Sequence, residues 1–207
     1  EAGVGIEHTD EGHAGVVVAL GDHLGADEDV DFADGEAPED IAAAALYNMA
    51  LCRRMLGESE QARESLERYR KDFSANDERA VDIAYQLGDI HDKAGRTEEA
   101  IEEYKRSLAA NPPEELVSEL HYRIGLCREQ LEDLDGALSA YRKARKVKDK
   151  RDDFRLLAVA RCAAIYETQE NYKGALAAYR DLIDNATDPE LVVAAQERAS
   201  QLETFVE

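Results

Sequence analysis

Apolar residues recur along most of the chain at intervals of three and four positions, the spacing that gathers them on one face of an α-helix. The stretch that contains Ile83, Leu87 and Ile90 is a clear example. Gly57 and Gly95 fall between such stretches, as is typical just past a helix end. The pattern predicts nine helices, near residues 38–56, 59–72, 78–94, 97–110, 113–131, 134–147, 151–169, 172–186 and 189–205.

Within this helical pattern, four stretches of the chain align with one another without gaps through their central parts. The anchor of each is an alanine, and the anchors are spaced 38, 37 and 38 residues apart: Ala62, Ala100, Ala137 and Ala175. Four residues after each anchor comes a bulky side chain: Leu66, Tyr104, Tyr141 and Tyr179. Twelve residues before it comes a small one: Ala50, Gly88, Gly125 and Ala163. Because a small residue lets two helices cross closely, each repeat is predicted to be a helix pair.

The four stretches resemble the tetratricopeptide repeat, and the second one, AYQLGDIHDKAGRTEEAIEEYKRSLAANP, is the most similar to it. The resemblance implies an all-α fold, a right-handed superhelical solenoid of antiparallel helix pairs that binds other proteins and is not an enzyme. Two features depart from the family's pattern. The opening aromatic is replaced by Leu46, Ala84, His121 and Val159, and the period exceeds the usual 34 residues or so.

The repeats divide the chain into three parts. Residues 1–36 are an acidic N-terminal segment, in which 11–24 have the apolar density of the second helix of a truncated preceding repeat, or alternatively of a strand. Residues 37–188 hold the four helix pairs. Residues 189–207 are predicted to form a C-terminal capping helix that shields the last repeat.

The net charge of −21 is unevenly distributed, because residues 1–40 carry thirteen acidic residues and no Lys or Arg. Such a chain repels nucleic-acid phosphates and anionic membrane surfaces, and it steers basic partners towards itself. The alternative is that the acidity only confers solubility. The sequence contains no run of 18 apolar residues, so membrane insertion is not predicted.

The three cysteines, Cys52, Cys127 and Cys162, have no metal-binding spacing and lie among apolar residues. Free thiols of this kind favour a reducing compartment, so a cytoplasmic location is predicted, and the start of the chain has no secretory leader pattern. A bacterial periplasmic or envelope-associated location is the alternative, since similarly long repeats occur in some envelope members of the family.

In the tetratricopeptide repeat family, the first helix of each repeat lines a concave groove. Tyr47, Tyr85 and Tyr122 occupy equivalent positions on the predicted first helices. The resemblance therefore predicts a peptide-binding groove formed by Tyr47, Leu51, Arg54, Asp82, Tyr85, Asp89, Asp92, Glu119, Tyr122, Leu126 and Glu129. Tyrosines suit peptide recognition, and the acidic neighbours favour a basic or apolar protein segment as partner. The alternative is that the tyrosines only pack between adjacent first helices.

No catalytic motif occurs, and no cofactor or metal is predicted. The alternating acids Asp27, Asp29, Asp31 and Asp34 do not meet the EF-hand spacing, and His8, His13 and His23 suit no single helical face. The predicted function is a non-enzymatic protein-interaction scaffold. The alternative is a self-association module, a homo-oligomer in which the N-terminal segment of one copy occupies the groove of another.

Overall fold

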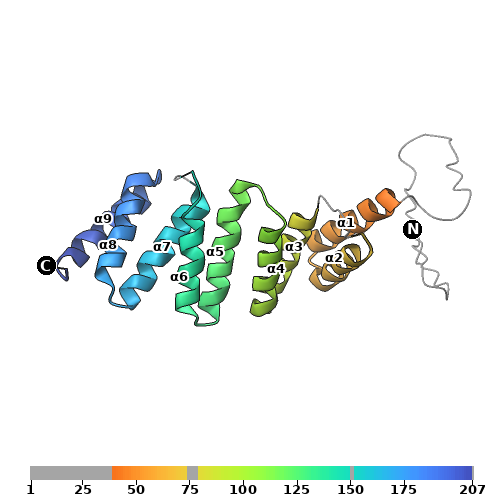
Figure 1. Cartoon of the computed structure of the whole chain (residues 1–207), viewed down its shortest axis with the longest axis horizontal. Coiled ribbons are helices and arrows are strands. Elements are labelled where there is room, and N and C mark those ends of the chain that lie inside the picture. Colours follow the sequence, from red (N-terminus) through yellow and green to blue (C-terminus); the bar gives the residue numbers. More distant parts are fainter. Residues whose placement is uncertain (1–38, 74–78, 150–151, 207) are drawn as a thin grey trace, which may run out of the picture. The chain divides into compact units, whose positions relative to one another are not determined.

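The structure is a computed structural model, and it describes residues 39–73, 79–149 and 152–206. The regular elements in these ranges are all α-helices (Figure 1): α1 (Glu39–Met55), α2 (Ser59–Phe73), α3 (Ala80–Lys93), α4 (Thr97–Ala109), α5 (Glu114–Gln130), α6 (Leu134–Ala144), α7 (Asp153–Thr168), α8 (Tyr172–Asn185) and α9 (Pro189–Glu203). The all-α class and the helix order are confirmed, and every helix end lies within three residues of its predicted position. Residues 1–36 lie outside the described ranges.

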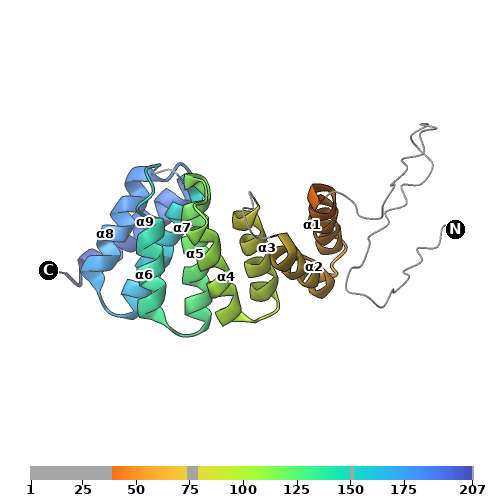
Figure 2. The same cartoon turned by 45° about the vertical axis from the view of Figure 1, so that its right-hand side comes forward.

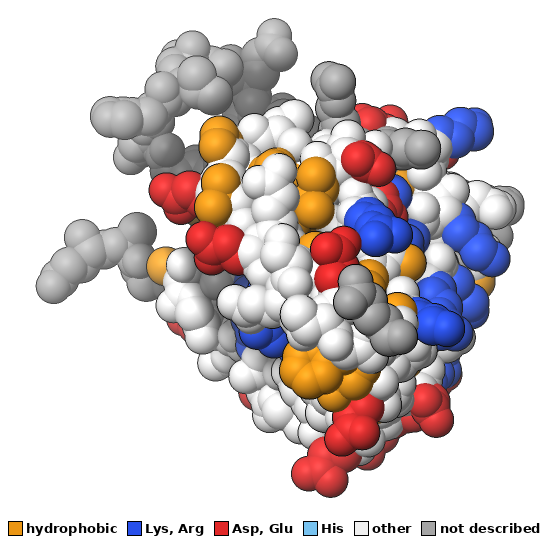
Figure 3. Space-filling view, turned by 90° about the vertical axis from the view of Figure 1, so that its left-hand side faces the viewer, with side chains coloured by type: hydrophobic (Ala, Val, Ile, Leu, Met, Phe, Trp, Pro, Cys, Tyr) orange, Lys and Arg blue, Asp and Glu red, His pale blue; other side chains and the backbone are white. Residues whose placement is uncertain are grey.

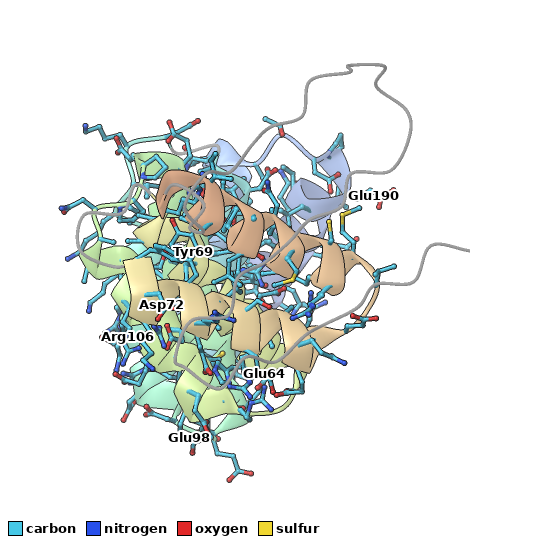
Figure 4. All side chains as sticks on the ribbon, turned by 90° about the vertical axis from the view of Figure 1, so that its right-hand side faces the viewer. Glu64, Tyr69, Asp72, Glu98, Arg106 and Glu190 are labelled. Carbon is cyan, nitrogen blue, oxygen red and sulfur yellow. The ribbon has the colours of Figure 1, made fainter. Side chains whose placement is uncertain are left out.

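The chain divides into two compact units, Glu1–Phe73 and Ser74–Glu207. The described part of the first unit is the pair α1 and α2. Tyr69 is buried on the side of α2 that faces α1 (Figure 4), and its ring centroid lies 6.2 Å from that of Tyr47. Glu64 and Asp72 are exposed, so α2 has one buried and one solvated face, as the helical spacing predicts.

The second unit contains three further helix pairs, α3 with α4, α5 with α6, and α7 with α8, which follow one another in chain order (Figure 2). The last helix, α9, packs against α8. The anchor alanines Ala100, Ala137 and Ala175 are fully buried on the second helices of these pairs. Their burial confirms the repeat register that the sequence predicts.

Two glycines on first helices show why small residues stand opposite the bulky ones. A β-carbon built on Gly88 would lie 2.6 Å from the ring of Tyr104, and one built on Gly125 would overlap the ring of Tyr141. Both tyrosine rings are fully buried. Because glycine has no side chain, the first and second helices of these repeats pack closer together here than any other residue would allow.

The turns between paired helices use left-handed backbone conformations. Gly57 and Gly95 have φ values of +80° and +73°, which glycine adopts without steric cost. The equivalent turns of the next two repeats place Glu132 and Glu170 at φ values of 60° and 56°. The residue after each of these glutamates caps the next helix. Asp133 accepts a hydrogen bond from the amide of Gly136 and caps α6, and Asn171 accepts one from the amide of Gly174 and caps α8.

The face of α9 that contacts α8 carries the buried residues Ala195, Ala199 and Leu202. Gln196, Glu197, Ser200 and Gln201 are exposed on the same helix. Figure 3 views the chain from the side of α9, where hydrophobic side chains form small separate groups among polar and charged ones. A polar outer face is what a capping helix needs, and the capping role of residues 189–207 stays a prediction. None of the described helices is long and apolar enough to cross a membrane.

The first testable prediction concerns the helix crossings. Replacing Ala137 with Leu is expected to lower the free energy of unfolding by about 1–3 kcal/mol, because the added atoms overpack a fully buried position. Ala177→Leu is the control, since Ala177 is exposed on the equivalent helix of the next repeat. Urea denaturation measures both. Equal stability of the two variants would show that the helix crossing accommodates the added atoms and would contradict this prediction.

Candidate functional site: the face of the first helices

The first helices of the second unit are joined side by side through polar contacts. The hydroxyl of Tyr85 on α3 donates a 2.6 Å hydrogen bond to Oε1 of Glu119 on α5. Nε of Arg161 on α7 donates a 2.9 Å hydrogen bond to Oε1 of Glu129 on α5. These contacts join α3, α5 and α7 into one continuous face, which we call the first-helix face.

At the α3–α5 junction, Arg123 organises a compact cluster. Its Nε lies 2.8 Å from Oε1 of Glu119, and its Nη1 lies 3.5 Å from Oδ1 of Asp89. The guanidinium carbon also lies 5.2 Å from the ring centroid of Tyr85, within cation–π range. Burial, and then the hydrogen bond to the Glu119 carboxylate, raise the pKa of Tyr85 to about 12. The Tyr85 hydroxyl therefore stays protonated and keeps donating to Glu119 at neutral pH.

A second arrangement occurs twice along the unit and links a repeat to the next one. The Tyr141 hydroxyl donates to Glu129, and Glu129 also pairs with Arg161 of the following first helix. One repeat later, Tyr179 donates to Glu167, and Glu167 pairs with Arg198 on α9. Each glutamate thus joins the second helix of its own repeat to the next helix along, and we call these arrangements the Tyr–Glu–Arg bridges.

Tyr122 takes part mainly in packing. Its ring centroid lies 5.8 Å from that of Tyr141 and 5.9 Å from that of Phe154 on α7. The side chain is half-buried, so part of it remains accessible. Tyr122 therefore supports the junction between two first helices and also contributes to the surface there.

The residues of the predicted groove do not form a single cluster. Tyr85, Asp89 and Glu119 are brought together by Arg123, while Glu129 belongs to a Tyr–Glu–Arg bridge. The other residues of the predicted groove that lie in the second unit are half-buried: Asp82, Asp92, Tyr122 and Leu126. Asp82 accepts a 3.1 Å hydrogen bond from Nε2 of Gln86. The predicted residues of the first unit, also half-buried, are Tyr47, Leu51 and Arg54, all on α1.

The prediction from sequence did not include the arginines that hold this face together. Arg123 and Arg161 lie 38 residues apart, and Arg198 follows 37 residues later. These intervals equal the repeat spacing, so the periodicity carried a signal for a shared structural position. Because the arginines pair with Glu119, Asp89 and the bridge glutamates, the first-helix face is less acidic than its carboxylates alone suggest.

No group of three or more His, Cys, Asp or Glu side chains in the described ranges is placed to hold a metal ion. The aspartates and histidines of the N-terminal segment that were considered as metal ligands lie outside those ranges. Cys127 and Cys162 are buried, and burial followed by the charge of Asp92 raises the pKa of Cys127 to about 12. This thiol is protonated at neutral pH and is a poor nucleophile.

Comparisons with known proteins agree on one family. Two family models described as tetratricopeptide repeat match residues 41–112 and 85–153, and together they span more than half of the chain. A search of curated proteins found no match.

Solved structures give the same fold. A crystal structure of MamA protein is 15% identical, with a TM-score of 0.60, and the match covers 81% of this chain and 89% of that one. A tetratricopeptide repeat protein from Parabacteroides merdae is 21% identical, with a TM-score of 0.57, over 81% of this chain and 60% of that one. Another MamA crystal structure is 19% identical, with a TM-score of 0.56, over 79% and 83% of the two chains.

Proposed function

Because this chain belongs to the tetratricopeptide repeat family, we propose that it is a non-enzymatic interaction scaffold that binds a segment of a partner protein on its first-helix face. The observation that carries the proposal is the continuity of that face. Hydrogen bonds join α3 to α5 and α5 to α7, so side chains from three successive repeats are held in fixed positions. An extended surface of this kind suits a peptide or helix that contacts several repeats at once.

The side chains on this face favour contact through apolar and aromatic groups. Tyr85 and Tyr122 are half-buried and restrained by their neighbours, and Leu126 is half-buried between the positions of Tyr122 and Glu129 on α5. Restrained aromatic side chains lose little conformational entropy on binding, which favours affinity. We therefore propose that apolar residues of the partner provide most of the binding energy.

Charge supplies a weaker preference. The four carboxylates outnumber the two cationic side chains that pair with them, Arg123 with Asp89 and Glu119, and Lys93 with Asp89; the carboxylates belong to Asp82, Asp89, Asp92 and Glu119. A partner with basic residues flanking its apolar ones complements this balance. Since Arg123 offsets part of the acidity, we expect the salt dependence of binding to be modest.

The test pairs two substitutions at the same end of α5. Leu126→Lys adds a charge to the first-helix face, whereas Leu131→Lys adds the same charge at an exposed position just past the helix end. Peptides selected from a random display library against the unaltered chain provide the binding probe. Leu126→Lys is expected to weaken binding by about 1–2 kcal/mol or more, because it removes an apolar contact and repels basic residues. Leu131→Lys should leave binding unchanged.

Thermal melting of the two variants separates binding from folding. Comparable melting together with a selective loss of binding in Leu126→Lys supports the first-helix face. Equal affinities for the two variants would place the binding surface elsewhere on the chain and reject the proposal.

A further inference from the structure

The first helix of the chain, α1, carries apolar side chains that are exposed. Ile41, Met55 and Leu56 are 55%, 87% and 74% exposed, and Cys52 is exposed as well. Ile41, Ala45 and Cys52 are separated by four and seven positions, so they lie along one side of the helix. We call the side defined by Ile41, Ala45, Cys52 and Leu56 the open face of α1. It differs from the positions of Tyr47, Leu51 and Arg54.

The repeat register shows what this face corresponds to in later repeats. The positions equivalent to Cys52 on α5, α7 and α9 are Cys127, Ile165 and Leu202, and all three are buried. Cys127 packs in one core cluster with Ala100, Ile101 and Tyr104 of α4, the second helix of the preceding repeat.

The same relation holds at the next two junctions. Ile165 of α7 shares a core cluster with Leu138 and Tyr141 of α6, and Leu202 of α9 shares it with Leu176 of α8. At each of these junctions the positions that correspond to Ile41, Ala45 and Cys52 are buried or half-buried where the preceding second helix packs, whereas those that correspond to Leu56 on α5 and α7 are exposed. The open face of α1 is therefore an apolar surface of the type that a preceding segment covers elsewhere in this chain.

We infer that the open face of α1 is covered by an apolar stretch of the same chain, residues 14–20. This stretch, AGVVVAL, has no charged residue and contains three consecutive valines and a leucine. Residues 14–20 lie outside the part of the chain that the structure describes. The inference does not depend on the proposed function, because it concerns a different surface.

Chain connectivity supports this choice of occupant. Residues 21–38 separate the stretch from α1, and 18 extended residues reach about 60 Å. The 17 residues of α1 extend over only about 25 Å, so the connection reaches any point on the open face. A tethered segment also has an effective concentration in the millimolar range, which favours it over a free partner or a second copy.

The composition of the open face fits an aliphatic occupant. Ala44 and Ala45 are half-buried and small, so they permit close approach of a packed segment. Branched side chains such as Val16 and Val18 fill the space beside small residues, and covering Ile41 and Leu56 removes apolar surface from water.

Cys52 provides a direct probe of the cover. The chain has three cysteines, and the other two, Cys127 and Cys162, are buried. The rate at which a thiol reagent modifies Cys52, followed by mass spectrometry on the full chain, therefore reports whether the open face is covered. The double variant Val16→Asp with Val18→Asp is expected to raise this rate about tenfold or more, as expected when the uncovered state is a minor population of the unaltered chain.

Two controls keep the experiment decisive. The double variant Val4→Asp with Ile6→Asp adds the same charge to the N-terminal segment and is expected to leave the Cys52 rate unchanged. Slow modification of Cys127 and Cys162 shows that each variant remains folded. If these two thiols also react quickly in the first variant, Leu20→Asp in the full chain repeats the test.

Three outcomes would overturn the inference. If Cys52 of the unaltered chain reacted as fast as in the Val16→Asp, Val18→Asp variant, the face would be uncovered. If the rate were slow but rose on dilution of the protein, the cover would be a second copy. If the rate were slow in every variant, other residues would form the cover.

Discussion

Replacing Asp181 with Ala is expected to lower the free energy of unfolding by about 3–5 kcal/mol, since it removes the carboxylate that accepts two hydrogen bonds from a buried guanidinium. Arg155 on α7 is only 6% exposed at its side chain, and Asp181 on α8 is 15% exposed. Nη2 of Arg155 donates hydrogen bonds of 2.7 and 2.9 Å to the two carboxylate oxygens. Arg145, just past α6, donates a third of 2.8 Å, so the carboxylate joins residues from two repeats.

Because this contact lowers the pKa of Asp181, it also makes the free energy of unfolding depend on pH. Burial opposes ionisation, but hydrogen bonds from Arg155 and Arg145 outweigh it and hold the pKa of Asp181 below its ordinary value of 3.8. A carboxyl whose pKa is lower in the folded state contributes stability above the unfolded pKa and loses it as the pH falls through the folded pKa. The unaltered chain should therefore lose this contribution below about pH 4, and Asp181→Asn should show a correspondingly flatter profile.

Asp184→Ala is the matched control, because Asp184 is exposed on the same helix and its removal has the same effect on net charge. Urea denaturation at neutral pH measures the free energy of unfolding of both variants. A loss of less than about 1 kcal/mol for Asp181→Ala would show that the cluster behaves like an exposed ion pair and would contradict the prediction.

The helices and their register could be predicted from the sequence because they rest on local and periodic signals. Ala100, Ala137 and Ala175 repeat at fixed spacing, and each is fully buried where two helices cross. Gly88 and Gly125 likewise mark positions where a tyrosine ring leaves no room for a β-carbon. Such signals need no knowledge of the distant chain, since the spacing alone places the residues on one side of a helix.

The polar network of the first-helix face could not be predicted in the same way. Tyr85 and Glu119 are 34 residues apart, and Arg161 and Glu129 are 32 apart, so each contact depends on how neighbouring repeats stack. The sequence predicts that these side chains lie on neighbouring first helices, but it does not predict which acidic residue each arginine pairs with. Arg123 pairs with Glu119 and Asp89, whereas the equivalent Arg161 pairs with Glu129.

Tyr141 is the position at which core packing and this network coincide, and Tyr141→Ala is expected to destabilise the chain by about 3–5 kcal/mol. The ring is fully buried against Gly125, and its hydroxyl donates to Glu129 in a Tyr–Glu–Arg bridge. Tyr141→Phe keeps the ring and removes only the hydrogen bond to a charged acceptor, so a loss of about 1.5–3 kcal/mol is expected.

Tyr179 provides the comparison that separates the two contributions. It makes the equivalent hydrogen bond to Glu167 but is half-buried, so Tyr179→Ala should cost less than Tyr141→Ala while the two Phe variants should cost similar amounts. Urea denaturation of the four variants measures these differences. Equal losses for the two Ala variants would contradict the view that burial of the ring dominates. Phe variants without any loss would show that the bridges only accompany the stacking of repeats and do not stabilise it.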